Sequence, residues 1–227
     1  MTSRCRILPL LALLLAAGRA AAMAPGADPH VNAPFASPDH GRWVEAFERP
    51  GRELYDRRQA VLAALALQPG MRVADVGAGT GLYTELFARA VAPGGRVYAV
   101  DVASTFVRAI EDRARALGLQ NVQGIVNTQR STLLPPGSVD LVFVADTYHH
   151  FEHPADMLRS IHEALRPAGE LVIVDFRRDP EVASAWVLHH VRAGREQVIH
   201  EVELAGFRYA GEEPLLRESF FLRFRKP

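Results

Sequence analysis

The chain has 227 residues, of which 48% are hydrophobic and 23% are charged, as is usual for a globular protein. Its 26 basic and 26 acidic residues give a formal net charge of zero, so the sequence lacks the excess of positive charge that is typical of nucleic-acid-binding proteins. The single cysteine, Cys5, excludes a disulfide framework, a cysteine-ligated metal site and a cysteine nucleophile in the rest of the chain. Length and composition favour one main domain whose chemistry uses oxygen and nitrogen groups.

The first 22 residues have the pattern of a secretory signal peptide. Arg4 and Arg6 precede an apolar run over residues 7–17, and the small residues at 20–22 form a cleavage site before Met23. The apolar run is about half the roughly 20 residues that a membrane-spanning helix needs. We therefore predict that residues 1–22 are a signal peptide, that the protein is exported to the periplasm, and that no stable membrane insertion remains after cleavage.

Residues 23–51 are predicted to be a flexible lead-in to the main domain. Four prolines and little periodicity over residues 24–38 favour irregular structure. Further on, aromatic and histidine side chains gather on the approach to the first predicted helix, at His40, Trp43 and Phe47, and in its first turn, at Tyr55. We interpret this segment as a lid that excludes water and selects an apolar or planar ligand. Packing against the edge of the main domain is the equally weighted alternative.

Helix and strand patterns alternate along the main domain, residues 52–227. Apolar residues at helical spacing predict helices over 52–67, 104–117 and 154–165, another that begins near Leu82, and one near 180–205. Short runs rich in Val and Ile predict strands at 72–76, 96–100, 121–126, 140–145 and 170–175. The runs 207–212 and 218–225 favour a closing antiparallel pair. Strands without strict alternation, separated by helices, indicate an α/β fold with a parallel sheet covered on both faces.

A glycine-rich turn joins the first predicted strand to the next helix. Residues 75–81 read Asp-Val-Gly-Ala-Gly-Thr-Gly, and these glycines let the backbone pass close under a ligand at a helix N-terminus. Leu82 stands where a dinucleotide fingerprint needs its third glycine, and no Gly-Lys-Ser/Thr occurs, so neither a Rossmann dinucleotide turn nor a Walker loop fits. Asp101 ends the next strand, 20 residues after Gly81, where a carboxylate accepts hydrogen bonds from ribose hydroxyls.

Residues 75–81 and Asp101 resemble the first two motifs of class I S-adenosylmethionine-dependent methyltransferases. The resemblance continues through residues 134–142 and 165–171 and is most similar to the small-molecule methyltransferases related to ubiquinone and menaquinone biosynthesis. It implies a Rossmann-like fold with a seven-stranded, mostly parallel sheet whose last strand is antiparallel. It also implies S-adenosyl-L-methionine as the cofactor, with cofactor contacts from Asp75, Gly77, Ala78, Gly79, Thr80, Gly81, Asp101, Val102, Asn127 and Asp146.

The resemblance also divides these contacts among the parts of the cofactor. Asp75 and the glycine backbone are expected to hold the methionine part and Asp101 the ribose, while Val102 packs near the adenine. Relatives usually carry an aspartate that contacts adenine where this chain has Asn127, whose amide can accept or donate the same hydrogen bonds. Asp146 is expected to hold the amino group of the cofactor.

Histidines and a tyrosine follow the fourth predicted strand, in the crevice where open α/β sheets bind ligands. Methyl transfer from a sulfonium needs alignment, and it needs removal of a proton where the acceptor carries one. A histidine can take such a proton near neutral pH. We therefore take His149, Tyr148 and His150 as catalytic candidates, with ordinary loop packing as the alternative, and predict an enzyme that methylates a small-molecule acceptor.

The histidines also suggest a second interpretation, a transition-metal site formed by His149, His150 and His153 with His189 and His190. Adjacent histidines rarely supply two ligands in one good geometry, and neighbours on a helix point about 100° apart. We therefore expect no metal ligands. The alternative to the enzyme is a non-catalytic exported protein that binds a ligand or a metal on the same fold.

Overall fold

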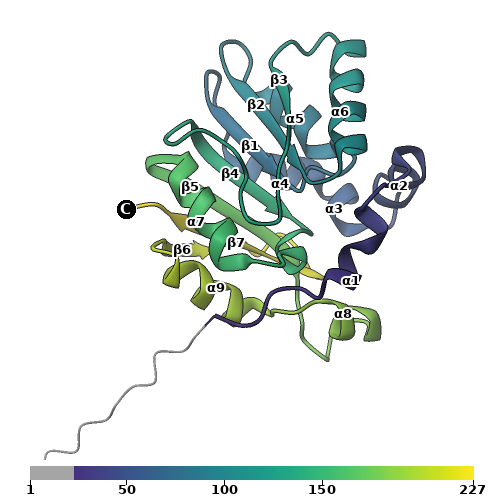
Figure 1. The fold of residues 1–227 in the computed structure, drawn as a ribbon, viewed down its shortest axis with the longest axis vertical. Coiled ribbons are helices and arrows are strands. Elements are labelled where there is room, and N and C mark those ends of the chain that lie inside the picture. Colours follow the sequence, from purple (N-terminus) through teal and green to yellow (C-terminus); the bar gives the residue numbers. More distant parts are fainter. Residues whose placement is uncertain (1–22) are drawn as a thin grey trace, which may run out of the picture.

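The computed structural model describes residues 23–227, so the predicted signal peptide lies outside the described residues. Seven strands form one sheet in the order β3-β2-β1-β4-β5-β7-β6 (Figure 1). The strands are β1 (Arg72–Val76), β2 (Arg96–Asp101), β3 (Val122–Val126), β4 (Val139–Ala145), β5 (Leu165–Phe176), β6 (Arg208–Glu212) and β7 (Ser219–Arg225). Only β7 runs against its neighbours, β5 and β6, in this described sheet. The predicted fold class, with its antiparallel last strand, is confirmed.

Nine α-helices and two short 3-10 helices make up the rest of the regular structure in residues 23–227. They are α1 (Pro29–Asn32), η1 (Ala33–Phe35), α2 (His40–Phe47), α3 (Glu53–Asp56), α4 (Arg58–Leu65), α5 (Leu82–Ala90), α6 (Ser104–Ala116), η2 (Tyr148–His150), α7 (Pro154–Ala164), α8 (Ala185–His190) and α9 (Arg195–Leu204). Among these described helices, none is both long and apolar enough to cross a membrane.

The core consists of two apolar layers, one on each face of the sheet. On β4, Leu141 and Phe143 pack in one layer with residues of α4 and α5. Val142 and Val144, which alternate with them, pack in the other layer with residues of α7 and α9. Because successive side chains of a strand point to opposite faces, a strand buried on both sides reads as a continuous apolar run. The sheet is thus covered by packed apolar side chains on both faces.

Two predicted helices are broken in the structure. The helix predicted over 52–67 is divided into α3 and α4 at Arg57, and the one predicted near 180–205 is divided into α8 and α9 by residues 191–194. The second break does not interrupt the apolar pattern of the sequence. Val191 and Ala193, which lie in the break, are buried although they are not helical. Periodicity reports which side chains are buried, and it does not report whether the backbone between them is helical.

The N-terminal segment, residues 23–51, contains α1, η1 and α2 where irregular, flexible structure was predicted. Asp28 accepts a hydrogen bond from the backbone of His30 at the start of α1, and Asp39 accepts one from Arg42 at the start of α2. These are N-cap contacts, which a search for apolar periodicity overlooks. The backbone N–H of Ala27 also donates to Phe151 O at 2.9 Å, which ties the segment to the loop after η2.

Candidate functional site

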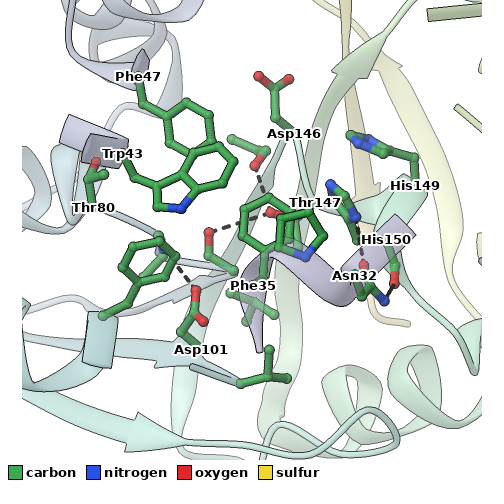
Figure 2. Close-up of a pocket in the computed structure, with 18 of the residues that line it drawn as sticks. Asn32, Phe35, Trp43, Phe47, Thr80, Asp101, Asp146, Thr147, His149 and His150 are labelled. Carbon is green, nitrogen blue, oxygen red and sulfur yellow. Dashed lines mark hydrogen bonds between the residues drawn. The ribbon is translucent and has the colours of Figure 1, made fainter. Parts of the chain in front are cut away.

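A cavity of about 840 Å³ lies at the carboxyl ends of β1, β2, β3 and β4, the edge of an open α/β sheet where ligands bind. Its walls come from the glycine turn, the residues after β2, β3 and β4, the N-terminal segment and α8. Figure 2 shows Thr80 and Asp101 on one side of this space and His149 and His150 on the other. We call these two parts the glycine side and the histidine side.

The glycine turn is fixed by Asp101. Its Oδ2 accepts a hydrogen bond from Gly79 N at 2.9 Å, and its Oδ1 accepts one from Ala103 N at 2.8 Å. Burial raises the pKa of the Asp101 carboxyl, and these two backbone hydrogen bonds partly offset the effect. Each carboxylate oxygen has more than one acceptor position. Asp101 can therefore hold the turn and still accept hydrogen bonds from a ligand in the cavity.

Gly77 can be replaced only with strain, because its φ of +74° lies in the left-handed region and its backbone lies against Thr147. A Cβ atom at position 77 would lie 2.2 Å from Thr147 Cγ2. Thr147 is held in turn, since its hydroxyl donates to Ala145 O at 2.8 Å. The end of β1 and the residues after β4 are thereby packed directly against each other.

Asp75 lies at the floor of the glycine side, and it is almost completely buried. The hydroxyl of Thr84 on α5 donates to Asp75 Oδ2 at 2.6 Å. Burial raises the pKa of Asp75 to about 7, against the smaller lowering effect of the Thr84 hydrogen bond. A cationic group in the cavity would favour the ionised form of this carboxyl.

Two residues that line the cavity each have a buried side-chain oxygen without a hydrogen-bond partner among residues 23–227. These oxygens are Asn127 Oδ1, just after β3, and Asp146 Oδ1, just after β4. The Asn127 amide donates to Thr128 O at 2.9 Å, which leaves its carbonyl as an acceptor. Buried polar atoms are usually satisfied. Because both residues line the cavity, a rotation of either side chain would offer its unpaired oxygen to a ligand that donates a hydrogen bond. The adenine and methionine amino groups expected at these two positions fit that requirement.

Asp146 has a special backbone geometry, with φ of +46° in the left-handed region. Its Oδ2 accepts from the guanidinium of Arg52 at 2.5 Å. Burial raises the pKa of Asp146 to about 6, although Arg52 lowers it. The sequence did not identify Arg52 as a site residue, because its pairing with a carboxylate 94 positions away leaves no local signal.

The predicted cofactor residues come together, with one exception. The cavity is lined by Asp75, Gly77, Ala78, Gly79, Thr80, Asp101, Val102, Asn127 and Asp146. Gly81 does not line it and instead caps α5, where a Cβ atom would lie 2.8 Å from Ile110 Cγ1. Gly81 is therefore expected to shape the turn through packing, whereas the resemblance implied a direct contact.

Two of the three catalytic candidates face the histidine side. The buried His149 has its Nδ1 2.7 Å from Asp175 Oδ1, and His150 has its Nδ1 2.7 Å from Asn32 Oδ1. Burial lowers the pKa of His149, but Asp175 outweighs it and the net shift is upward. Burial and the neighbouring His149 lower the pKa of His150 to about 3.

Tyr148 is the exception among the catalytic candidates. Its side chain is fully buried outside the cavity, and its hydroxyl donates to Glu201 Oε2 at 2.6 Å. Arg192 pairs with the same carboxylate at 2.9 Å. The structure thus gives Tyr148 a packing role, in place of the catalytic role suggested by its position in the sequence.

The N-terminal segment supplies the aromatic part of the cavity wall, as the lid interpretation requires. Phe35, Trp43 and Phe47 pack against one another in sequence as tilted ring pairs, with ring centroids 4.8 Å apart in each neighbouring pair. Figure 2 shows the three rings gathered in the middle of the site. His40 adds a contact to the glycine turn, with its Nε2 3.2 Å from Thr80 O. The arrangement presents flat apolar surface to a bound molecule.

Comparisons with known proteins agree with this geometry. Residues 74–173 match the family model described as a methyltransferase domain. The ubiquinone/menaquinone biosynthesis C-methyltransferase UbiE of Ectopseudomonas mendocina (strain ymp) is 32% identical over 113 residues, which cover 49% of this chain and 44% of that protein. The chain thus spans less than half the length of this curated relative.

Among solved structures, a SAM dependent methyltransferase from Aquifex aeolicus has a TM-score of 0.74 and 26% identity, and the match covers 84% of this chain and all of that one. The [4+2]-cyclase SpnF has the same fold at 20% identity, with a TM-score of 0.65 over 78% of this chain and 83% of that one. Residues 74–173 are thus similar to a methyltransferase domain, and the fold is similar to that of a SAM-dependent methyltransferase, a class whose cofactor is S-adenosylmethionine.

Replacing Asp101 with alanine should weaken the binding of S-adenosylhomocysteine about 5- to 150-fold. The reason is the loss of charge-assisted hydrogen bonds worth roughly 1–3 kcal/mol. Isothermal titration calorimetry measures the change, and Asp112→Ala, which removes an exposed carboxylate on α6, is the matched control. Undiminished affinity in folded Asp101→Ala protein would refute the assignment of Asp101 to the ribose.

Asp75 should make the ligand-free protein less stable as the pH rises. Because burial raises its pKa from 3.8 to about 7, the folded protein retains a proton that the unfolded chain releases. The stabilising contribution has its full value below about pH 4. It falls as the pH rises and is lost once the pH passes about 7. Between about pH 5 and about pH 8, the wild type should lose about 2–3 kcal/mol more unfolding free energy than Asp75→Asn. Urea unfolding at both pH values measures the difference, and equal pH dependence would contradict the assigned burial effect.

Proposed function

We propose that this protein transfers the methyl group of S-adenosylmethionine to a small-molecule acceptor. The observation that carries the proposal is the division of one cavity into two chemically different sides. The glycine side has the acidic and amide acceptors that suit the cofactor. The histidine side and the aromatic residues of the N-terminal segment would hold the acceptor. The similarity of the domain to UbiE, which is described as a C-methyltransferase of ubiquinone and menaquinone biosynthesis, supports the same direction.

The chain's own residues would contribute alignment and exclusion of water. Bound S-adenosylmethionine supplies a methyl group that is already activated on a sulfonium. Asp75, Asp101 and Asp146 would hold the cofactor, and Asn127 would accept from its adenine. Phe35 and Trp43 would cover the reacting pair, since alignment of two bound molecules in a closed site is the main source of rate in a displacement of this kind.

The proposed acceptor is a small molecule with a flat or apolar part. The three neighbouring rings of Phe35, Trp43 and Phe47 favour such a shape. His149 and His150 would lie next to its reacting atom, because they are imidazoles on the side of the cavity opposite Thr80 and Asp101 in Figure 2. The non-catalytic alternative is not favoured, because the family match and the similar solved structure are both of methyltransferases.

Labelled methyl groups can test this proposal before the acceptor has been identified. The purified protein is incubated with methyl-labelled S-adenosylmethionine and an extract of the producing cells, separated beforehand into small molecules and macromolecules. We expect label in the small-molecule fraction with the wild type and much less with Asp101→Ala. Label in protein or nucleic acid would contradict the proposed acceptor class, and no transfer to either fraction would contradict the activity.

We also propose that the protein acts after export, on the strength of the charged, apolar and small-residue pattern of residues 1–22. Fractionation of the producing cells, with mass spectrometry of the N-terminus, tests this location. Periplasmic protein that begins near Met23 is the expected result. Full-length protein confined to the cytosol would contradict it.

A further inference from the structure

Three histidines from two separate elements meet at the wall of the cavity. His149 and His150 belong to η2 and His190 is the last residue of α8. A ring nitrogen of each lies within 4.8 Å of one in each of the other two. The ring centroids are 4.1 Å apart for His149 and His150, 5.2 Å for His149 and His190, and 5.3 Å for His150 and His190. Although His149 and His150 are adjacent on η2, their ring centroids lie only 4.1 Å apart, and the third imidazole comes from a different element.

The ring of His149 is oriented by a carboxylate. Asp175 Oδ1 lies 2.7 Å from His149 Nδ1, and Asp175 Oδ2 accepts the backbone N–H of His149 at 3.0 Å. Asp175 also accepts the backbone N–H of Phe176 at 2.8 Å, so its position is fixed from several sides. Because a carboxylate accepts hydrogen bonds, Nδ1 carries the proton and Nε2 of the neutral ring is free to be a ligand. Histidines that bind metals usually have such a partner on the other nitrogen.

The ring of His150 is oriented by an amide in the same way. Asn32 Oδ1 lies 2.7 Å from His150 Nδ1. Asn32 Nδ2 donates to His150 O at 3.0 Å and to Glu152 Oε1 at 2.8 Å. Exchanging the oxygen and nitrogen of the amide would break both hydrogen bonds. The amide oxygen therefore accepts from Nδ1, and Nε2 of His150 keeps its lone pair. Asn32 belongs to the N-terminal segment, so this segment helps to organise the cluster.

We propose that His149, His150 and His190 bind a divalent transition-metal ion and leave a coordination position open to the cavity. Three imidazoles suit zinc, copper, nickel or ferrous iron and do not suit magnesium or calcium. Metal–nitrogen bonds of about 2.0–2.1 Å require ligand nitrogens roughly 3.3 Å apart, which small side-chain rotations can reach from the present separations. Three protein ligands and an open position are typical of catalytic metal sites.

The open position would face the part of the cavity that we assign to the acceptor. A bound metal ion lowers the pKa of a hydroxyl group that coordinates to it, so the proton would pass to solvent more easily. The class of acceptor that this chemistry fits is a flat or apolar molecule with a hydroxyl or phenol group. This use of the ion rests on the proposed function, whereas the metal site itself does not.

Cobalt binding tests the site directly. The full-length protein is treated with a chelator, and Co²⁺ is added while the visible d–d absorption is recorded. We expect a spectrum that saturates at one ion per chain, with at least about tenfold weaker binding in His190→Gln. Asn32→Ala, which removes an orienting partner and no ligand, should also weaken binding roughly tenfold. His189→Gln is the matched control, since His189 is an exposed neighbour on α8 outside the cluster.

Two outcomes would overturn the metal site. One is the absence of cobalt binding by wild-type protein that is folded by circular dichroism. The other is binding that His190→Gln leaves unchanged or that His189→Gln weakens equally. Calorimetric titration of S-adenosylhomocysteine into the metal-free wild type keeps the two proposals apart: retained cofactor binding without metal binding would overturn the metal site alone, and loss of both would count against the cofactor site as well.

Discussion

Replacing Glu201 with alanine should lower the free energy of unfolding by about 3–5 kcal/mol, the usual effect of removing one partner from a buried ion pair. Glu201 is fully buried on α9, where it accepts from Tyr148 at 2.6 Å and pairs with Arg192 at 2.9 Å. Without the carboxylate, the guanidinium of Arg192 stays largely buried and unpaired. Urea unfolding at neutral pH measures the loss.

Glu203→Ala is the matched control, because Glu203 lies on the same helix and is exposed. It should change the unfolding free energy by no more than about 0.5 kcal/mol. Equal, small effects of the two substitutions would show that the carboxylate of Glu201 is not essential to the fold.

The position of Glu201 explains why we expect so large an effect. Its Oε1 also accepts the backbone N–H of Ala24 at 3.2 Å, so one carboxylate joins α9, η2 and the N-terminal segment. Burial raises the pKa of Glu201, but hydrogen bonds from Arg192 and Tyr148 outweigh that effect and hold the pKa below its usual range. A lowered pKa contributes stability above the unfolded value of 4.5, and this contribution is lost as the pH falls below it.

Replacing Gly77 with alanine should cost about 2–5 kcal/mol of stability. Left-handed backbone costs a non-glycine residue roughly 1–2 kcal/mol, and forced close packing adds roughly 1–3 kcal/mol. Here the new methyl group would lie 2.2 Å from Thr147, whose own hydroxyl is held by Ala145 O. We also expect weaker cofactor binding, because the end of β1 must move away from the residues after β4.

Gly79→Ala separates the effect of backbone strain from that of the close contact. Gly79 has φ of +52°, but an added Cβ atom would find no neighbour closer than Gly77 O at 3.9 Å. Its expected cost is about 1–2 kcal/mol from the backbone alone. Chemical denaturation of both variants measures the two costs, and a loss no greater in Gly77→Ala than in Gly79→Ala would contradict the packing against Thr147.

The residues of the site that lie directly at the carboxyl ends of the strands could be predicted from the sequence. The strand from Arg72, the glycine turn and Asp101 lie close together along the chain, and parallel strands bring their carboxyl ends to one edge. The position of Asn127 and Asp146 at that same edge follows from the order of the strands. The sequence pattern of each strand was sufficient here, because each of these residues is positioned by the strand that it follows.

The histidine side depends on contacts between distant parts of the chain, and only some of it could be predicted. Tyr148 was a wrong catalytic candidate because Glu201, 53 positions away, determines where its hydroxyl points. His190 on α8 lies next to His149, with ring centroids 5.2 Å apart, although the two are far apart in the sequence. Arg52 reaches Asp146 across 94 positions, and no local pattern marks such a pair.

The most direct test of the cofactor site is a calorimetric titration of S-adenosylhomocysteine into the purified protein. Nine predicted cofactor residues line one cavity, and two of them have a buried side-chain oxygen without a partner among the described residues. We predict binding of one molecule per chain with micromolar affinity. No heat of binding from a protein that unfolds cooperatively would contradict the cofactor site and, with it, the proposed methyl transfer.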